Sequence, residues 1–298
     1  MKNLNNNQDQ IIIICGPTAS GKSRYALDMA KKIEGAIINA DSMQIYNSLP
    51  LITASPSTDD KKQVPHFLYN FLSPDSAYSV AKYVEDCNQA IIDAQKNNLI
   101  PIITGGTGMY INALLGGLSS IPEIDKSHRE EIIDLVQKYG TKFLYEKLSE
   151  IDPESASRLN PADTQRIIRA YEIKSFTGKS ILEFQQRNQP AILSNFNVKT
   201  YYIKPERKFL YETCDSRFLS IIQNGGIEEV AQFKNSYPNI ETGPAKALGV
   251  AELSSYLLQE ISLEEAIKQA QTKTRQYAKR QLTWFNNQIT WEHEVKSF

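Results

Sequence analysis

Residues 11–23 read Ile-Ile-Ile-Ile-Cys-Gly-Pro-Thr-Ala-Ser-Gly-Lys-Ser. The isoleucine run predicts a buried strand, which continues into the spacing G-x-x-x-x-G-K-[ST] of a phosphate-binding loop. In such a loop, backbone N–H groups converge on phosphate oxygens, the lysine reaches the outer phosphate, and the last hydroxyl can ligate Mg²⁺. The helix that follows presents its positive end to the same anion. The sequence therefore predicts a pyrophosphate site, with Ser23 as metal ligand, formed by Gly16, Pro17, Thr18, Ala19, Ser20, Gly21, Lys22 and Ser23.

The motif leaves open what the pyrophosphate is attached to. By default it indicates a nucleotide-binding, ATP-binding site, and the structural alternative is a glycine-containing turn with an incidental lysine. Most P-loop ATPases and GTPases also carry a metal-binding aspartate at the end of a neighbouring strand. The strand candidate 99–104 ends instead in Thr104-Gly105-Gly106-Thr107-Gly108, which favours a group-transfer enzyme over a nucleotide switch.

Composition excludes several classes of protein. The chain has 298 residues, 41% of them hydrophobic and 22% charged, which is enough for a large core and for two domains or one domain with an insertion. No apolar run approaches the roughly 20 residues that span a bilayer, so we expect no membrane association. Lys and Arg number 33 against 34 Asp and Glu, which excludes a uniformly basic coat but allows one locally basic face for nucleic acid.

The chain start and the cysteines indicate the compartment. Residues 1–10 are polar and Asn-rich without a hydrophobic signal region, so we expect a disordered tail on a cytoplasmic protein. Cys15, Cys87 and Cys214 are widely spaced and odd in number. They form neither a disulfide framework nor a zinc pattern, so we expect reduced thiols.

Strands and helices alternate in the first third of the chain. We expect strands at 10–15, 36–39, 66–71 and 99–104, with helices at 21–34, 79–97 and 108–116. This alternation predicts an α/β fold with a parallel P-loop sheet flanked by helices.

Beyond the first third the pattern becomes helical. Residues 126–188 read as helices only, and the pairs Asp152-Pro153 and Asn160-Pro161 each place a capping residue before a proline at a first helical position. We expect an all-helical insertion domain at 123–192 and a core domain formed by 11–122 and 193–298. Within that core we expect a returning strand at 199–204 and a helical C-terminal part whose last helix runs from about 262 to 290.

Two polar residues follow strands at the edge where parallel sheets bind ligands. Asp41 comes after the strand 36–39, where a carboxylate can act as a general base or help to hold a metal ion. The alternative is that Asp41 caps a turn. Thr107 can donate its hydroxyl to a phosphate oxygen, and the alternative is that it caps the next helix.

The C-terminal helix is basic and aromatic. Residues 266–291 contain no Asp or Glu, and Lys273, Tyr277, Arg280 and Trp284 share a helical face. We expect the aromatic residues to pack in the core and the cations to contact the phosphates of a nucleic acid, namely Lys268, Lys273, Arg275, Lys279 and Arg280.

Four arginines elsewhere allow two interpretations. Arg158, Arg166 and Arg169 form a second basic group, for which ion pairing with Asp163 or Glu172 is as good an explanation as nucleic acid. Arg217 follows the returning strand, and taken alone it would be an ordinary surface arginine.

Together these motifs resemble the tRNA dimethylallyltransferase family, bacterial type, from residue 11 to about residue 292. The segments that carry the resemblance are 16–23, 41–46 (Asp-Ser-Met-Gln-Ile-Tyr), 78–81, 105–110 (Gly-Gly-Thr-Gly-Met-Tyr), 163–170 and 274–285. Departures are Ser55, where the family commonly has lysine, and Val250, where it usually has tyrosine. The sequence does not show the zinc-binding tail of some eukaryotic members, so we expect an enzyme of the bacterial type.

The resemblance implies transfer of a dimethylallyl group from its diphosphate to N6 of the adenosine on the 3′ side of the tRNA anticodon. It implies that Asp41 takes the N6 proton, that Thr107 and Arg217 lie at the diphosphate, and that Mg²⁺ is the cofactor. The helical insertion would clamp the anticodon stem-loop of the tRNA, and we expect a monomer. The residues it implies for tRNA contact are Asp41, Ser42, Met43, Gln44, Thr107, Arg129, Gln165, Arg166, Ile167, Ile168, Arg169, Lys273, Arg275, Lys279 and Arg280.

Two other functions compete with prenyl transfer. A small-molecule P-loop kinase would use Asp41 to activate an acceptor hydroxyl, but it does not explain the basic helix. A non-enzymatic RNA-binding module explains the helix, but it gives Asp41, Thr107 and Arg217 no shared purpose.

Overall fold

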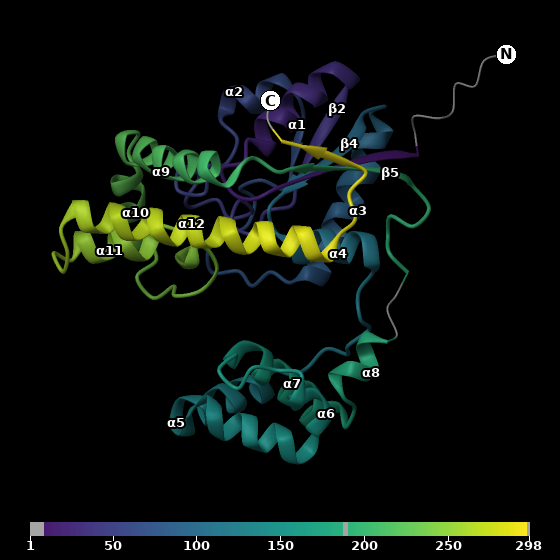
Figure 1. Cartoon of the computed structure of the whole chain (residues 1–298), viewed down its shortest axis with the longest axis vertical. Helices are drawn as coiled ribbons and strands as arrows, with labels where there is room; N and C mark the ends of the chain where they lie inside the picture. The colour runs from purple at the N-terminus through teal and green to yellow at the C-terminus, as the bar shows by residue number, and fades with distance from the viewer. Residues whose placement is uncertain (1–8, 187–189, 297–298) are drawn as a thin grey trace. The chain divides into compact units, whose positions relative to one another are not determined.

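The computed structural model of the chain describes residues 9–186 and 190–296 (Figure 1). Its central feature is a six-stranded sheet with the order β3-β2-β4-β1-β5-β6, in which every pair of neighbouring strands is parallel. The strands are β1 (Gln10–Cys15), β2 (Gly35–Asn39), β3 (His66–Phe67), β4 (Ile100–Gly105), β5 (Asn197–Ile203) and β6 (His293–Val295). The α/β class and the parallel sheet predicted from the sequence are confirmed.

The isoleucine runs place β1 and β4 in the middle of this sheet. Ile13 pairs with Ile103, and both side chains are fully buried. Alternate residues of β1 pack into different cores, Ile11 and Ile13 on one face and Ile12 and Ile14 on the other. A strand buried on both faces needs apolar residues at every position, which explains why these runs do not alternate.

Helices cover both faces of the sheet. Helix α1 (Lys22–Ile33) packs on one face through Ala26, Leu27 and Ala30. On the other face lie α3 (Val80–Lys96) and α4 (Gly108–Gly116), together with Phe285 from the C-terminal helix. The short α2 (Thr58–Gln63) begins at a capping box made by Ser57 and Asp60.

The C-terminal part forms a helical layer of its own, visible in Figure 1 as a stack of helices beside the sheet. It contains α9 (Arg207–Gln223), α10 (Gly226–Ser236), the 3₁₀ helix η1 (Gly243–Lys246), α11 (Val250–Leu257) and α12 (Leu263–Gln288). Their shared core includes Phe218, Val230 and Leu253. Val250 is buried in this core, so the side chain at this departure from the family pattern packs inside the protein.

The chain divides into two compact units, one formed by Met1–Leu115 with Ile192–Phe298 and the other by Gly116–Ala191. The second unit overlaps the expected insertion, 123–192, and all the regular structure in its described residues is helical. It contains α5 (Lys126–Ile151), α6 (Pro153–Ser157), α7 (Thr164–Thr177) and α8 (Ile181–Gln185) around a core of its own. Helix α5 is interrupted at Gly140, whose φ of 84° lies in the left-handed region.

Three details of the secondary structure differ from the prediction. The strand expected at 66–71 is only His66–Phe67, because Leu68 and Asn70 have positive φ values of 63° and 52° and turn the chain away from the sheet. Strand β6 was not predicted. Asn160-Pro161 does not begin a helix, since the Asn160 side chain accepts from Ala162 N in a turn and Asp163 caps α7 instead. The expected disordered tail lies outside the described residues at 1–8, and Gln10 already belongs to β1.

Asp152 does cap α6 as expected, with Ser155 N donating to its side chain at 3.2 Å. The three cysteines are free and buried, as the sequence indicated. Among the described helices, none is both long and apolar enough to cross a membrane.

Candidate functional site

A cavity of about 570 Å³ lies at the carboxyl edge of the sheet, between the loops after β1 and β2 and helix α9. Parallel α/β sheets bind ligands at this edge. The cavity brings together the phosphate loop (Gly16–Ser23), Asp41 and Arg217, three features far apart in sequence. It is lined by Thr18, Ala19, Gly21, Lys22, Ser23, Asp41, Gln44, Thr53, Ala54, Thr213, Ser216, Arg217 and Ser220.

The phosphate loop is folded tightly, and two of its amides are bonded within the chain: Thr18 N donates to Gln281 Oε1 and Ser20 N donates to Pro17 O. Ala19 and Gly21 have positive φ values of 60° and 86°, and Lys22 Nζ donates back to Pro17 O at 3.2 Å. Helix α1 has no acidic residue in its first turn and no side-chain cap at Gly21. The positive end of the helix dipole and its first N–H groups therefore point toward the loop, and no acidic side chain of α1 neutralises them.

Close packing beneath the loop requires a glycine at its start. A Cβ at Gly16 would lie 2.6 Å from the carbonyl oxygen of Ile203 and 2.8 Å from Ser20 Oγ. Both distances are too short for nonbonded atoms, so any side chain at Gly16 would push the loop off β5.

Among the described residues, two cations, Lys22 and Arg217, and one carboxylate, Asp41, line this cavity. Arg217 Nη2 donates to Thr18 Oγ1 at 2.7 Å, so the guanidinium is attached to the phosphate loop through a neutral hydroxyl. Burial lowers the pKa of Lys22, an effect that the charge of Asp41 opposes and that of Arg217 reinforces. Burial likewise lowers the pKa of Arg217. Neither cation has a carboxylate in hydrogen-bond contact among the described residues, which leaves an excess of positive charge that an anionic ligand can neutralise.

Asp41 is held in place by Asn39, which the sequence analysis did not single out. Asn39 Nδ2 donates to the carbonyls of Asp41 (3.0 Å) and Leu68 (2.9 Å), while its Oδ1 accepts from Asp41 N at 2.8 Å. One carboxylate oxygen of Asp41 accepts from Met43 N at 2.9 Å, so the turn-capping alternative is real. Oδ2 has no hydrogen bond within the described part of the chain, and Asp41 therefore caps a turn and still presents an oxygen to the cavity.

Thr107 lies beside the Asp41 loop and does not line the cavity. Its Oγ1 accepts from Ser42 N at 2.9 Å and donates to Ser42 Oγ at 3.3 Å. The residue also begins α4, because Tyr110 N donates to its carbonyl. Thr107 thus joins the loop after β4 to the loop after β2, a contact across 65 positions of sequence.

Some cations of the basic helix α12 are ion-paired, and others are exposed without an ion pair among the described residues. Lys273 pairs with the buried Glu252 at 2.5 Å, and Arg275 pairs with Asp215 at 2.5 Å. Lys279 and Arg280 are exposed and form no ion pair among the described residues, although Arg280 lies over the ring of Tyr277. The aromatic residues pack inward as expected, with Phe285 fully buried and Trp284 against the same core.

In the second unit, the arginines form ion pairs with carboxylates, as the second of the two interpretations expected. Arg169 and Arg129 both approach the buried Glu172, at 2.7 and 3.6 Å, and Arg166 lies 3.5 Å from Asp163. Arg158 pairs with Glu154 at 2.7 Å. Gln165 and Arg166 remain exposed, whereas the Ile167 side chain is fully buried and Ile168 packs against the same core.

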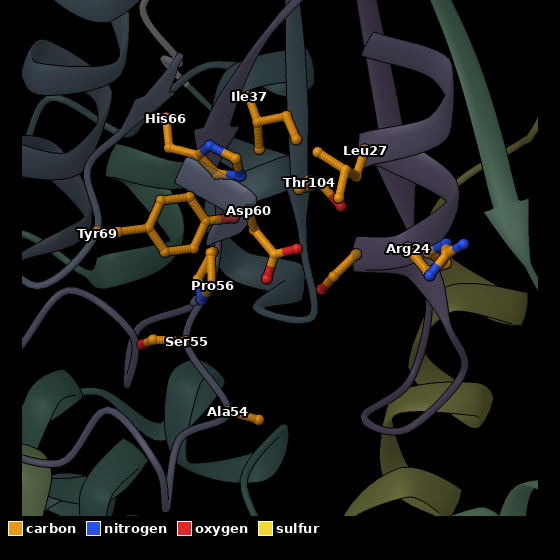
Figure 2. A pocket seen from close by; sticks show the side chains of 11 residues that line it. Arg24, Leu27, Ile37, Ala54, Ser55, Pro56, Asp60, His66, Tyr69 and Thr104 are labelled. Carbon is orange, nitrogen blue, oxygen red and sulfur yellow. The ribbon is translucent and has the colours of Figure 1, made fainter. Parts of the chain in front are cut away.

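A second, smaller cavity of about 280 Å³ shares Ser23 and Ala54 with the first (Figure 2). The side chains of Asp60, His66 and Tyr69 gather on one wall of it, opposite Arg24 and Leu27 of α1. Burial lowers the pKa of His66. Thr104 is the second-last residue of β4, near the strand end where many P-loop proteins have an aspartate, and its buried hydroxyl has no hydrogen-bond partner in the described chain.

A metal ion would find few ligands in this protein. No group of three or more His, Cys, Asp or Glu side chains with metal-binding geometry occurs among the described residues. The cavity offers the Ser23 hydroxyl and the free carboxylate oxygen of Asp41, to which a bound ligand would add phosphate oxygens. This sparse set suits Mg²⁺, which keeps most of its waters and uses substrate phosphates.

A parallel sheet flanked by helices, with a glycine-rich loop after a central strand, places the protein in the α/β class. Comparison with known proteins narrows the class. A family model described as IPP transferase matches residues 44–288, and the chain belongs to this family. The match begins after the phosphate loop and Asp41, so those residues are covered by the individual relatives below.

The relatives are similar over nearly the whole chain. The tRNA dimethylallyltransferase of Rickettsia conorii is 46% identical over 288 residues, which cover 97% of this chain and 79% of that protein. That of Rickettsia bellii is 45% identical over 284 residues, covering 94% of this chain and 89% of the relative.

Solved structures show the same fold. The tRNA isopentenylpyrophosphate transferase of Bacillus halodurans has a TM-score of 0.66 at 32% identity and covers 97% of this chain and 92% of its own. A eukaryotic dimethylallyltransferase described as acting on tRNA has a TM-score of 0.78 at 28% identity. The match covers 93% of this chain and 70% of the eukaryotic chain.

Proposed function

We propose that this protein transfers a dimethylallyl group from dimethylallyl diphosphate to N6 of the adenosine 3′-adjacent to the tRNA anticodon. One observation carries the proposal: the phosphate loop, Arg217 and the free oxygen of Asp41 face a single cavity. Family membership supports it, because relatives over nearly the full chain are named for this reaction.

The chemistry requires a leaving-group site beside a base. The N6 nitrogen attacks C1 of the dimethylallyl group, the bond from C1 to the diphosphate oxygen breaks, and pyrophosphate leaves with both electrons. Asp41 accepts the proton that N6 loses. Lys22, Arg217 and the loop amides stabilise the charge that develops on the departing diphosphate, and Thr107 holds the neighbouring loop in place.

Mg²⁺ is part of this proposal. When bound, it would neutralise charge on the diphosphate, with Ser23 as its protein ligand. Because the reaction moves no phosphoryl group, an aspartate at the end of β4 is not needed, and Thr104 lies near that strand end.

The tRNA contacts follow from which cations remain exposed. Lys279 and Arg280 on α12 are available for backbone phosphates, since no carboxylate pairs with either among the described residues. Within residues 165–169, the exposed side chains are Gln165 and Arg166. Ser42 and Met43 follow Asp41 and line a neighbouring cavity, where we expect them to contact the target adenine. The target adenosine has to leave the anticodon stack to reach this depth. We further propose a monomer that acts in the cytoplasm, where tRNA is found and buried free thiols stay reduced.

The proposal is tested by incubating the protein with labelled dimethylallyl diphosphate, unmodified tRNA and Mg²⁺ in the absence of ATP. Label on tRNA is the expected result. Absence of label, together with phosphate transfer from ATP to a small alcohol, would instead support the kinase alternative. A protein that binds tRNA but transfers neither group would fit the RNA-binding alternative.

A further inference from the structure

Gln281 on α12 joins two loops of the site with the two ends of one amide. Its Oε1 accepts from Thr18 N at 2.7 Å, and its Nε2 donates to Gly106 O at 2.8 Å. Gln281 is only 6% exposed, although the two residues before it, Lys279 and Arg280, are on the surface. Gln281 is therefore a buried polar residue whose hydrogen bonds are both directed to loops of the candidate site.

The identity of the two partners demands this particular side chain. Thr18 N–H needs an acceptor and Gly106 C=O needs a donor, so the amide orientation is fixed by the chain itself. A glutamate cannot donate the second bond, and an apolar side chain leaves both backbone groups buried without a partner. The fit is close, since a Cβ at Gly106 would collide with the amide nitrogen of Gln281.

Each partner leads directly to a proposed site residue. Thr18 is also the residue whose hydroxyl accepts from Arg217 at 2.7 Å. Gly106 immediately precedes Thr107, which holds the Asp41 loop through Ser42. Gln281 thus connects the diphosphate side of the cavity to the base side, from a helix that belongs to neither loop.

We propose that Gln281 is a positioning residue that fixes the phosphate loop and the loop after β4 in the geometry that binds pyrophosphate. The inference rests on the proposed function for its choice of ligand. Helix α12 also carries Lys279 and Arg280, the cations proposed to contact tRNA. The hydrogen bond from Thr18 N to Gln281 therefore connects this helix to the phosphate loop.

The test is the affinity of the full-length protein for inorganic pyrophosphate with Mg²⁺, measured by calorimetry without tRNA. Gln281→Met removes both hydrogen bonds at similar volume and is expected to weaken binding about tenfold. Gln281→Glu keeps only the acceptor and adds a negative charge near the anion, so its loss is expected to be larger. The matched control is Gln269→Met on the same helix, whose amide makes only a surface hydrogen bond to Glu265, and its affinity is expected to be unchanged.

Calorimetry also separates positioning from mere stability. A variant that only unfolds more easily loses competent molecules, which lowers the binding stoichiometry and leaves the Kd of the folded fraction unchanged. Wild-type Kd in Gln281→Met would overturn the proposal while leaving the proposed function intact. Failure of the wild-type protein itself to bind pyrophosphate would contradict the proposed function as well as the inference.

Discussion

The cations of the sheet cavity and those of the second unit are held by different kinds of partner. Arg217 is attached to a hydroxyl and Lys22 to a carbonyl, both neutral. Arg169 and Arg129, by contrast, approach the buried carboxylate of Glu172. Neutral partners hold a side chain in place without consuming its charge, whereas a carboxylate neutralises it. The comparison supports the proposal that the cavity binds an anion, and it shows that Arg169 and Arg129 are partly neutralised by a carboxylate of their own unit.

The largest expected effect concerns the carboxylate that the cavity does contain. Asp41→Asn keeps the acceptor for Met43 N but removes the base, so kcat for prenyl transfer should fall by about 10³. Affinities for pyrophosphate and tRNA, measured by calorimetry and filter binding, should stay within about threefold and serve as internal controls. Near-normal turnover would show that Asp41 acts only as a turn cap.

The next effect removes a cavity cation that has a neutral partner. Arg217→Met should lower kcat/KM for dimethylallyl diphosphate by about 10², because charge on the leaving group loses a stabilising guanidinium. The control is Arg207→Met on the same helix, where the guanidinium donates to Tyr211 outside the cavity. Steady-state kinetics measures both variants. An equal loss of kcat/KM in Arg217→Met and Arg207→Met would refute the anion-site interpretation.

The pH dependence of pyrophosphate binding tests the other cavity cation. Burial lowers the pKa of Lys22 below its ordinary 10.5, and the ammonium is the form that binds an anion. Affinity should therefore fall as the pH rises through that lowered pKa. Lys22→Arg remains charged throughout, so the difference in pH slope between it and the wild type, measured by calorimetry, isolates Lys22. Parallel slopes would mean that Lys22 does not contact the anion.

A smaller effect is expected at the exposed cations of α12. Replacing Lys279 and Arg280 with alanine should weaken tRNA binding about tenfold at low salt and reduce the salt slope by about two, since each phosphate contact releases counterions. Filter binding across a salt series checks this. Alanine at Lys31 and Lys32, an exposed adjacent pair on α1, is the matched control and should leave the slope unchanged.

The last prediction concerns the stability of the second unit, where we expect the smallest effect on activity. Glu172→Gln removes the charge that Arg169 and Arg129 share and should destabilise this unit by about 1–3 kcal/mol. Hydrogen exchange of α7 amides in the full chain measures that change locally. Unchanged exchange would show that these arginines do not depend on Glu172.

The sequence predicted those parts whose physical cause is local. The isoleucine runs required buried strands, and the spacing of Gly16, Gly21 and Lys22 required a phosphate loop whatever its distant partners. The short β3 could not be seen, because the left-handed turns at Leu68 and Asn70 depend on contacts such as Asn39 to the Leu68 carbonyl.

The missed site residues depend on contacts between distant segments. Gln281 meets Thr18 across 263 positions, and nothing near it in sequence marks an amide that faces inward from a basic helix. Asn39 looked like an ordinary strand end, and its role depends on the Asp41 backbone and on Leu68. The i,i+3 pair of Arg169 with Glu172 was foreseeable as an alternative, whereas the addition of Arg129 required the fold of the second unit.

Nucleoside analysis of tRNA after incubation with dimethylallyl diphosphate and Mg²⁺, without any nucleotide, tests the central claim most directly. We predict that N6-dimethylallyl adenosine forms with one pyrophosphate released per modified base, and that Asp41→Asn slows the formation of both products by about 10³ while still binding pyrophosphate. Unmodified tRNA from the wild-type reaction, or modification that requires ATP, would contradict the account of a phosphate loop that holds an isoprenoid diphosphate.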